Sequence, residues 1–140
     1  MKIPDVNVLV AAFRPDHAQH RVCAQWLVDT MNGGEPLGLL HLVVTGFIRV
    51  TTHPRIFRSA TSPVQALQQI DFLLRHPGVE WVRPGAQYWD RFTALCRPFA
   101  SLADLTHDLH IAAAAIERQA TVVTMDRDFS RFPNVSVQAP

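Results

Sequence analysis

The sequence has only two cysteines, a single lysine and no long apolar run. Cys23 and Cys96 lie far apart and form no C-x-x-C or Cys/His pattern, which favours free buried thiols over a disulfide framework or a zinc site. No stretch approaches the roughly 20 consecutive apolar residues of a membrane helix. The N-terminus carries no signal-peptide pattern, because its apolar stretch is short and ends at Arg14-Pro15-Asp16. These absences predict a cytoplasmic protein with no membrane partner.

Charge of either sign is also scarce. Charged residues make up 18% of the chain and the formal net charge is +1, so no strong basic field points to a nucleic acid. The 13 basic residues are nevertheless all arginine apart from Lys2. Arginine binds phosphate and carboxylate groups through two hydrogen bonds at once, so the composition is compatible with an anionic partner.

The apolar pattern predicts one α/β domain over residues 1–140. A hydrophobic content of 48% excludes a disordered chain and allows a buried core. Short apolar runs predict strands at residues 2–5, 37–40, 79–82, 121–124 and 135–137. Helical patterns alternate with them, at residues 7–13, 17–32, 41–52, 63–75 and 107–119, and around Trp89. Strands separated by helices are typical of βαβ units, so we expect a parallel sheet with helices on both faces.

Several residues mark the expected ends and faces of these elements. Pro4 fits the edge or the end of a sheet, because proline cannot donate to the ladder. Asp16 is expected to cap the second helix and Ser62 the fourth. On the fourth helix, Leu67 and Ile70 follow helical spacing and are expected to face the core.

The most informative stretch is residues 120–132. Its β-branched run, 121–124, predicts a buried strand, and Asp126 and Asp128 follow that run. Open α/β sheets place their chemistry at the C-terminal ends of parallel strands, where these carboxylates would lie. The alternative is structural: Asp126 caps the next turn, and Asp128 adds favourable charge there.

Two more carboxylates are expected at the same edge of the sheet. Asp5 ends the first strand, and Asp108 lies in the first turn of the helix that leads into the 121–124 strand. Small apolar residues along that helix suit tight packing on a sheet, which would hold its start over the strand ends. Asp5, Asp108 and Asp126 are therefore expected to converge.

Converging carboxylates repel one another unless a cation lies between them. Mg²⁺ and Mn²⁺ prefer carboxylate and water oxygens, and Mg²⁺ usually keeps several waters. Such an ion orients a water, helps it ionise and stabilises charge on a phosphodiester. Asp5, Asp108 and Asp126 are therefore candidate catalytic residues and candidate metal ligands.

Four passages carry a family resemblance: residues 5–9 (DVNVL), 47–55 (FIRVTTHPR), 108–113 (DLHIAA) and 124–132 (TMDRDFSRF). In their order and spacing they resemble the PIN-domain nucleases of the VapC toxin type, and the match runs nearly the full length of the chain. The resemblance implies a PIN-like three-layer α/β/α sandwich with a short, mainly parallel central sheet. It also implies a metal-dependent endoribonuclease that uses Mg²⁺ or Mn²⁺.

The same resemblance implies partners and site residues. The family's toxins are homodimers that cut RNA and are inhibited by a cognate VapB-type antitoxin. We expect that antitoxin to place a basic side chain near the acidic pocket, where charges would pair. The family's site residues correspond here to the acidic positions Asp5, Asp108 and Asp126, an accessory metal position at Asp128, and supporting positions at Asn7 and Thr124.

One position departs from the family. The helix before the 47–55 passage commonly carries a glutamate where this chain has Gly46. None of the three glutamates, Glu35, Glu80 and Glu117, is expected to reach the site from its place in the predicted fold. The departure favours an alternative function, a catalytically impaired PIN-like module that binds RNA or protein. If three aspartates suffice, Gly46→Glu is expected to tighten metal binding, provided that the new side chain fits.

Basic residues near the expected site have two interpretations. Arg49 and Arg55, together with Arg58, either contact RNA phosphates or form a solvated face. His107 and His110 flank the helical aspartate, but no further Cys or His completes a zinc set. His110 is therefore expected to contact phosphate or to pack against its helix.

Overall fold

Five short strands form the centre of the fold, which a computed structural model describes for residues 1–140. They are β1 (Lys2–Pro4), β2 (Leu37–Leu40), β3 (Val79–Val82), β4 (Thr121–Val123) and β5 (Ser136–Gln138). Their order in the sheet is β3-β2-β1-β4-β5, and every neighbouring pair is parallel. The C-terminal ends of all five strands therefore lie at one edge of the sheet.

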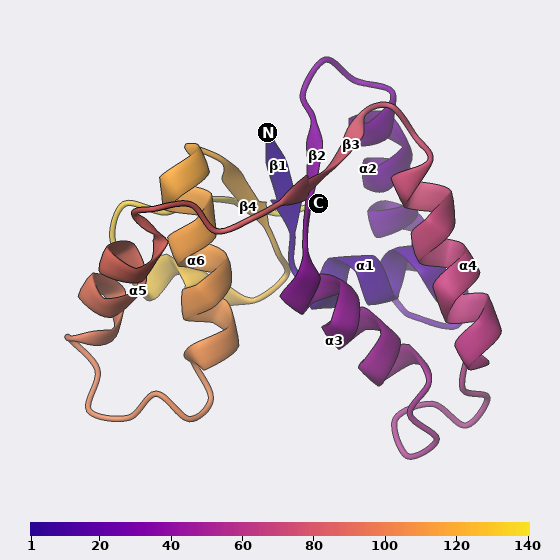
Figure 1. Ribbon diagram of the computed structural model, residues 1–140. Helices are drawn as coiled ribbons and strands as arrows, with labels where there is room; N and C mark the ends of the chain where they lie inside the picture. The colour runs from indigo at the N-terminus through magenta and orange to yellow at the C-terminus, as the bar shows by residue number, and fades with distance from the viewer.

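Helices cover both faces of this sheet (Figure 1). On one face lie α1 (Val6–Phe13), α2 (His20–Met31), α3 (His41–Thr51) and α4 (Pro63–Leu74); on the other lie α5 (Tyr88–Cys96) and α6 (Thr106–Arg118). A 3-10 helix, η1 (Arg127–Arg131), follows β4. The predicted three-layer α/β/α sandwich is confirmed. None of its helices combines the length and apolarity that crossing a bilayer requires.

The central strand, β1, brings Asp5 to the C-terminal edge. Pro4 is the last residue of β1, so the expected strand end is right, whereas a place at the edge of the sheet is wrong. The proline cannot donate a hydrogen bond, but the next amide, Asp5 N, donates to Val123 O over 2.9 Å. This bond continues the ladder between β1 and β4 and fixes the backbone of Asp5.

Small side chains allow α6 to approach the sheet closely. Its residues 111–115 are all buried, and four of them are alanine. The first turn of α6 is thereby held above the strand ends, and this turn contains Asp108.

On α4 the buried face differs from the one expected. Ala66, Ile70 and Leu73 are buried, whereas the side chain of Leu67 is 53% exposed. Successive helical residues are rotated by 100°, so the burial of Ala66 carries Leu67 out of the core. The cap of this helix is as expected, because Ser62 Oγ accepts from Gln65 N and the Gln65 side chain accepts from Ser62 N.

The second helix begins later than expected. It starts at His20, with Gln19 as a cap residue that makes no side-chain capping bond. Asp16 instead pairs with Arg14, whose Nη2 lies 2.6 Å from Asp16 Oδ2. The Arg14 guanidinium outcompetes the helix amides for this carboxylate, because a charge-assisted bidentate pair is stronger than a cap. Both cysteines are free thiols, as expected.

Candidate active site

Three aspartates line one hollow of about 490 Å³ at the C-terminal edge of the sheet. Asp5 follows β1 and caps α1, and Asp126 lies three residues beyond β4. Asp108 reaches the same hollow from the first turn of α6. The topology explains the meeting, because β1 and β4 are neighbours and end at the same edge.

Asp5 is the most firmly held of the three carboxylates. It is only 6% exposed, and its Oδ1 accepts from Val6 N over 2.6 Å. Its Oδ2 accepts from Asn7 Nδ2 over 2.6 Å and from Thr124 Oγ1 over 2.7 Å. Asn7 and Thr124 therefore orient Asp5 and leave one lone pair of Oδ1 for a ligand.

Asp126 caps η1 with one carboxylate oxygen and also lines the hollow. Its Oδ1 accepts from Asp128 N over 2.9 Å, so it does cap η1. Its own amide donates to Thr124 Oγ1 over 2.9 Å, which ties it to the network around Asp5. The other oxygen, Oδ2, accepts no hydrogen bond from the chain. The structural and the functional interpretation of Asp126 are therefore compatible.

The side chain of Asp108 has no hydrogen bond or ion pair within the chain, although it is half-buried. Burial, and after it the charges of Asp5, Asp126 and Asp128, raise its pKa from 3.8 to about 6. Burial also raises the pKa of Asp5, while the hydrogen bonds from Thr124, Val6 and Asn7 act against it. The hollow thus collects negative charge, and no lysine or arginine lines it.

The donor set fits a hydrated ion better than an enclosed protein cage. As the side chains stand, no three His, Cys, Asp or Glu groups are close enough together to hold one ion. Mg²⁺ is commonly held by one or two carboxylates and retains several waters. The free lone pairs on Asp5 Oδ1 and Asp126 Oδ2 meet that requirement.

Asp128, expected as an accessory ligand, does not line the hollow. Its side chain is exposed, and its Oδ1 lies 3.7 Å from Arg131 Nη1. The η1 turn directs this carboxylate outward, while the amide of Asp128 donates to Asp126 Oδ1. Asp128 still acts on the site through its charge, which contributes to the raised pKa of Asp108.

None of the predicted basic contacts lines the hollow. Arg49 is exposed on the last turn of α3, and Arg55 is exposed in the turn that follows. His110 is half-buried, and its Nδ1 lies 2.5 Å from the hydroxyl oxygen of Tyr88. Burial, and after it the charge of His107, lowers the pKa of His110, and its ring packs against Tyr88 of α5.

The hollow also has an apolar side that the sequence did not reveal. Val10 and Val50 line it from α1 and α3, and Ile56 and Phe57 line it from the turn after α3. His17, which had no evident partner in the sequence, lies at its rim. One signal for His17 was present in the sequence: the break at residues 14–16, which ends α1 and so keeps His17 close to the end of that helix.

Gly46 lies where α3 passes closest to the start of α1. A Cβ built on it would lie 2.7 Å from Val6 Cγ2, closer than such atoms approach in proteins. Val50, one turn further along α3, lines the hollow, so this face of the helix does point to the site. Gly46→Glu therefore does not fit without movement of Val6, and the steric outcome is the one that the structure favours.

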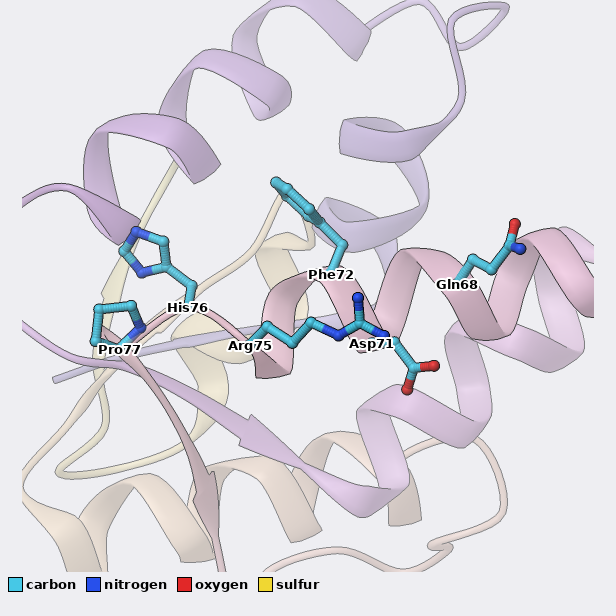
Figure 2. A pocket seen from close by; sticks show the side chains of 6 residues that line it. All are labelled: Gln68, Asp71, Phe72, Arg75, His76 and Pro77. Atoms are coloured by element: carbon cyan, nitrogen blue, oxygen red, sulfur yellow. The ribbon is translucent and has the colours of Figure 1, made fainter.

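A second hollow, of about 510 Å³, lies at the C-terminal end of α4 (Figure 2). Asp71 is its only acidic residue, and Arg75 lies beside it. It contains no predicted site residue and lies where the chain enters β3, at the N-terminal edge of the sheet. The gathered carboxylates therefore single out the other hollow.

Aspartates gathered at the C-terminal strand ends of a parallel α/β/α sandwich lie where this class of fold places its functional groups. The family model described as PIN domain matches residues 2–135, and the chain belongs to the PIN-domain family. Ribonuclease VapC43 of Mycobacterium tuberculosis is 40% identical over 136 residues, which cover 97% of this chain and 92% of that protein. Ribonuclease VapC25 of the same species is 33% identical, with coverage of 96% and 95%. This chain is thus similar over its whole length to VapC ribonucleases.

Solved structures agree on the fold. The crystal structure of VapBC2 from Rickettsia felis bound to a promoter DNA fragment matches with a TM-score of 0.71 at 18% identity, covering 99% of this chain and 97% of that one. VapC20 of M. tuberculosis, described as a toxin that cleaves the sarcin-ricin loop, matches with a TM-score of 0.68 at 15% identity, covering 97% and 99%. At these identities the likeness establishes the shared PIN-type architecture.

Proposed function

We propose that this protein is a metal-dependent endoribonuclease that acts as the toxin of a toxin–antitoxin pair. The observation that carries the proposal is the hollow lined by Asp5, Asp108 and Asp126, none of which forms an ion pair with a basic side chain of the protein. The VapC ribonucleases, similar over the whole chain, support RNA as the substrate. Mg²⁺ or Mn²⁺ is the proposed cofactor, because the available ligands are carboxylate oxygens.

Each carboxylate has a distinct part in this proposal. Asp5 and Asp126 would hold the ion through the oxygens that the chain leaves free. When bound, such an ion lowers the pKa of a water and stabilises charge on the phosphodiester. Asp108, which has no partner in the chain, is free to accept a hydrogen bond from a water in the hollow and so to orient it. Asn7 and Thr124 keep Asp5 in place and exclude alternative rotamers.

The second candidate function is a PIN-like module that binds RNA or protein but has lost catalysis. Gly46 favours it, because α3 supplies no carboxylate to the hollow. Glu117 does not compensate, since its two oxygens accept hydrogen bonds from Gly85 N and Gln87 N. Three aspartates, each with a carboxylate oxygen that can accept a further ligand, nonetheless match the one or two carboxylates that Mg²⁺ needs, so we favour the enzyme.

Cleavage of structured RNA by the purified protein tests the choice between the two. With Mg²⁺ or Mn²⁺ the protein should cut the RNA internally, and EDTA should stop the reaction. Added Mn²⁺ in excess of EDTA should restore it, which separates loss of metal from loss of fold. RNA binding without cleavage in both metals would favour the module, and equal cleavage in EDTA would rule out a metal-dependent enzyme.

We further propose a VapB-type antitoxin that places an arginine or lysine near Asp126. Support comes from the unbalanced acidic hollow, which attracts a basic group. Asp126→Asn should weaken binding of the antitoxin tail, measured by titration calorimetry. A toxin–antitoxin complex in which the hollow stays open and RNA cleavage continues would contradict this.

A homodimer is proposed as the working form of the toxin. The exposed apolar side chains on α4, Val64, Leu67 and Phe72, offer surface for a subunit contact. Light scattering at working concentration should give twice the mass of one chain, and a monomer would count against the proposal.

A further inference from the structure

Residues 55–58 form a turn that combines apolar and basic side chains at the edge of the acidic hollow. Ile56 and Phe57 line the hollow beside the aspartates, and Ile56 is 52% exposed. Arg55 and Arg58 flank them on both sides, are exposed, and take part in none of the ion pairs of the structure. We call residues 55–58 the RIFR turn.

The RIFR turn is held in a defined shape by contacts beneath it. Thr61 N donates to Thr51 O over 2.9 Å, which closes the connection between α3 and α4. Arg14, only 7% exposed, donates from Nη1 to Ser59 O over 2.8 Å and to Thr61 Oγ1 over 3.0 Å. The apolar side of the hollow is therefore preorganised, and a ligand would lose little entropy on ordering it.

Arg14 also supports the aromatic ring that faces the hollow. Its guanidinium carbon lies 4.1 Å from the centroid of the Phe57 ring, and its charge is paired with Asp16. The cation thus stacks on Phe57 without adding net charge to the site. Arg14 is a positioning residue for Phe57, because it is buried and is not among the residues that line the hollow.

The chemistry of the turn matches a single strand of nucleic acid better than a basic peptide. Single strands bind where apolar or aromatic faces receive bases and flanking cations meet the phosphates. Two unpaired arginines would repel a basic protein segment at this side of the hollow. They would attract a polyanion instead.

We propose that the RIFR turn binds the RNA strand next to the scissile phosphate, with a nucleobase against Ile56 and Phe57 and the adjoining phosphates on Arg55 and Arg58. The inference rests on the proposed function and adds where the substrate lies. A base can reach Phe57 only when it is unpaired, so the substrate class is RNA with an unpaired nucleotide beside the cut.

Binding of a fluorescein-labelled single-stranded RNA oligonucleotide, measured by anisotropy in EDTA, tests the apolar contact without cleavage. Ile56→Ala should weaken binding by roughly three- to tenfold, because the exposed side chain contributes contact area to the base. Val28→Ala is the matched control, since Val28 is 52% exposed on α2 and does not line the hollow, and it should bind like wild type. Equal affinity of wild type and Ile56→Ala, or no binding by wild type, would overturn the inference.

The salt dependence of the same binding tests the two arginines. Arg55→Gln and Arg58→Gln should each lower the slope of log affinity against log salt by about 0.7, the value for one phosphate contact on a single strand. Arg75→Gln, an exposed arginine that follows α4 at the opposite edge of the sheet, should leave the slope unchanged. Unchanged slopes for both turn variants would show that these arginines do not contact RNA.

A spectroscopic measurement separates base contact from a structural role. Wild type should quench 2-aminopurine placed at the central position of the oligonucleotide, and Phe57→Leu should lose this quenching while keeping an apolar packing partner for Arg14. Arg14→Lys should show the same loss if Arg14 positions the ring. Variants that keep the quenching would contradict the inference, as would turn variants that lose antitoxin binding but retain RNA binding. If wild type cleaves RNA with Mg²⁺ while these tests fail, the proposed function stands and only the location of the strand is wrong.

Discussion

Replacing Asp108 with asparagine is expected to stabilise the metal-free protein at neutral pH. Burial and the charges of Asp5, Asp126 and Asp128 raise the pKa of Asp108 from 3.8 to about 6. Between these values the folded protein binds more protons than the unfolded chain, so the free energy of unfolding falls as pH rises. Above about pH 6 the full destabilisation is present. Asparagine has nearly the same shape and cannot ionise, so it escapes this cost.

The size of the effect follows from the pKa difference. About two pKa units correspond to roughly 3 kcal/mol at about 1.4 kcal/mol per unit. Asp108 is only half-buried, and solvent screens the repulsion from its neighbours. We therefore expect Asp108→Asn to raise the free energy of unfolding by about 1 to 2 kcal/mol.

Urea unfolding in EDTA measures this difference. Near pH 7.5, Asp108→Asn should be the more stable protein, and near pH 4 the gap should shrink towards zero because wild-type Asp108 is then protonated. Asp71→Asn, which changes an exposed carboxylate on α4, controls for loss of one negative charge. Wild type as stable as Asp108→Asn near pH 7.5 would refute the claim that the hollow concentrates unbalanced charge.

Two further substitutions probe the packing and the hydrogen bonds around the hollow. Gly46→Glu should destabilise the protein by about 1 to 3 kcal/mol in urea unfolding, because its Cβ meets Val6 Cγ2 at 2.7 Å, and no loss of stability would show that the α1–α3 contact is loose. Thr124→Val removes the hydroxyl that donates to Asp5 and accepts from Asp126 N, so RNA cleavage should fall by roughly 10- to 100-fold and stability by about 1 to 3 kcal/mol. Wild-type cleavage by Thr124→Val would mean that Asp5 needs no such support.

The sequence was most informative where local pattern and topology agree. The β-branched run at 121–124 predicts a strand, residues 2–5 predict a short strand weakened by Pro4, and the helices between them favour a parallel connection. Parallel strands end at the same edge, so the strand assignments place Asp5 and Asp126 at one edge, and the pairing of β1 with β4 brings them together. Asp108 could be placed because small residues along α6 predict close packing on the sheet.

The remaining features depend on contacts between distant residues. The RIFR turn lies at the hollow because Arg14 binds Ser59 and Thr61, which follow it by 45 and 47 positions in the sequence. No local pattern encodes a contact over that separation. The tight approach of Gly46 to Val6 depends on how α1 and α3 cross. Asp128 lies outside the hollow because η1 turns its side chain outward. The spacing of Asp126 and Asp128 in the sequence does not show which of the two carboxylates a 3-10 helix directs away from the site.

The measurement that tests the central claim most directly compares Mg²⁺-supported RNA cleavage by wild type, Asp5→Asn and Asp71→Asn. Asp5 lies at the centre of the hydrogen-bonded carboxylate network, whereas Asp71 lies on α4 beside the other hollow. The proposed site predicts that Asp5→Asn lowers the rate of RNA cleavage by more than roughly 100-fold, the largest loss expected from removing a supporting residue. The secondary structure of the variant should be unchanged. Asp71→Asn should cleave like wild type. Cleavage by Asp5→Asn at the wild-type rate would contradict the assignment of the active site.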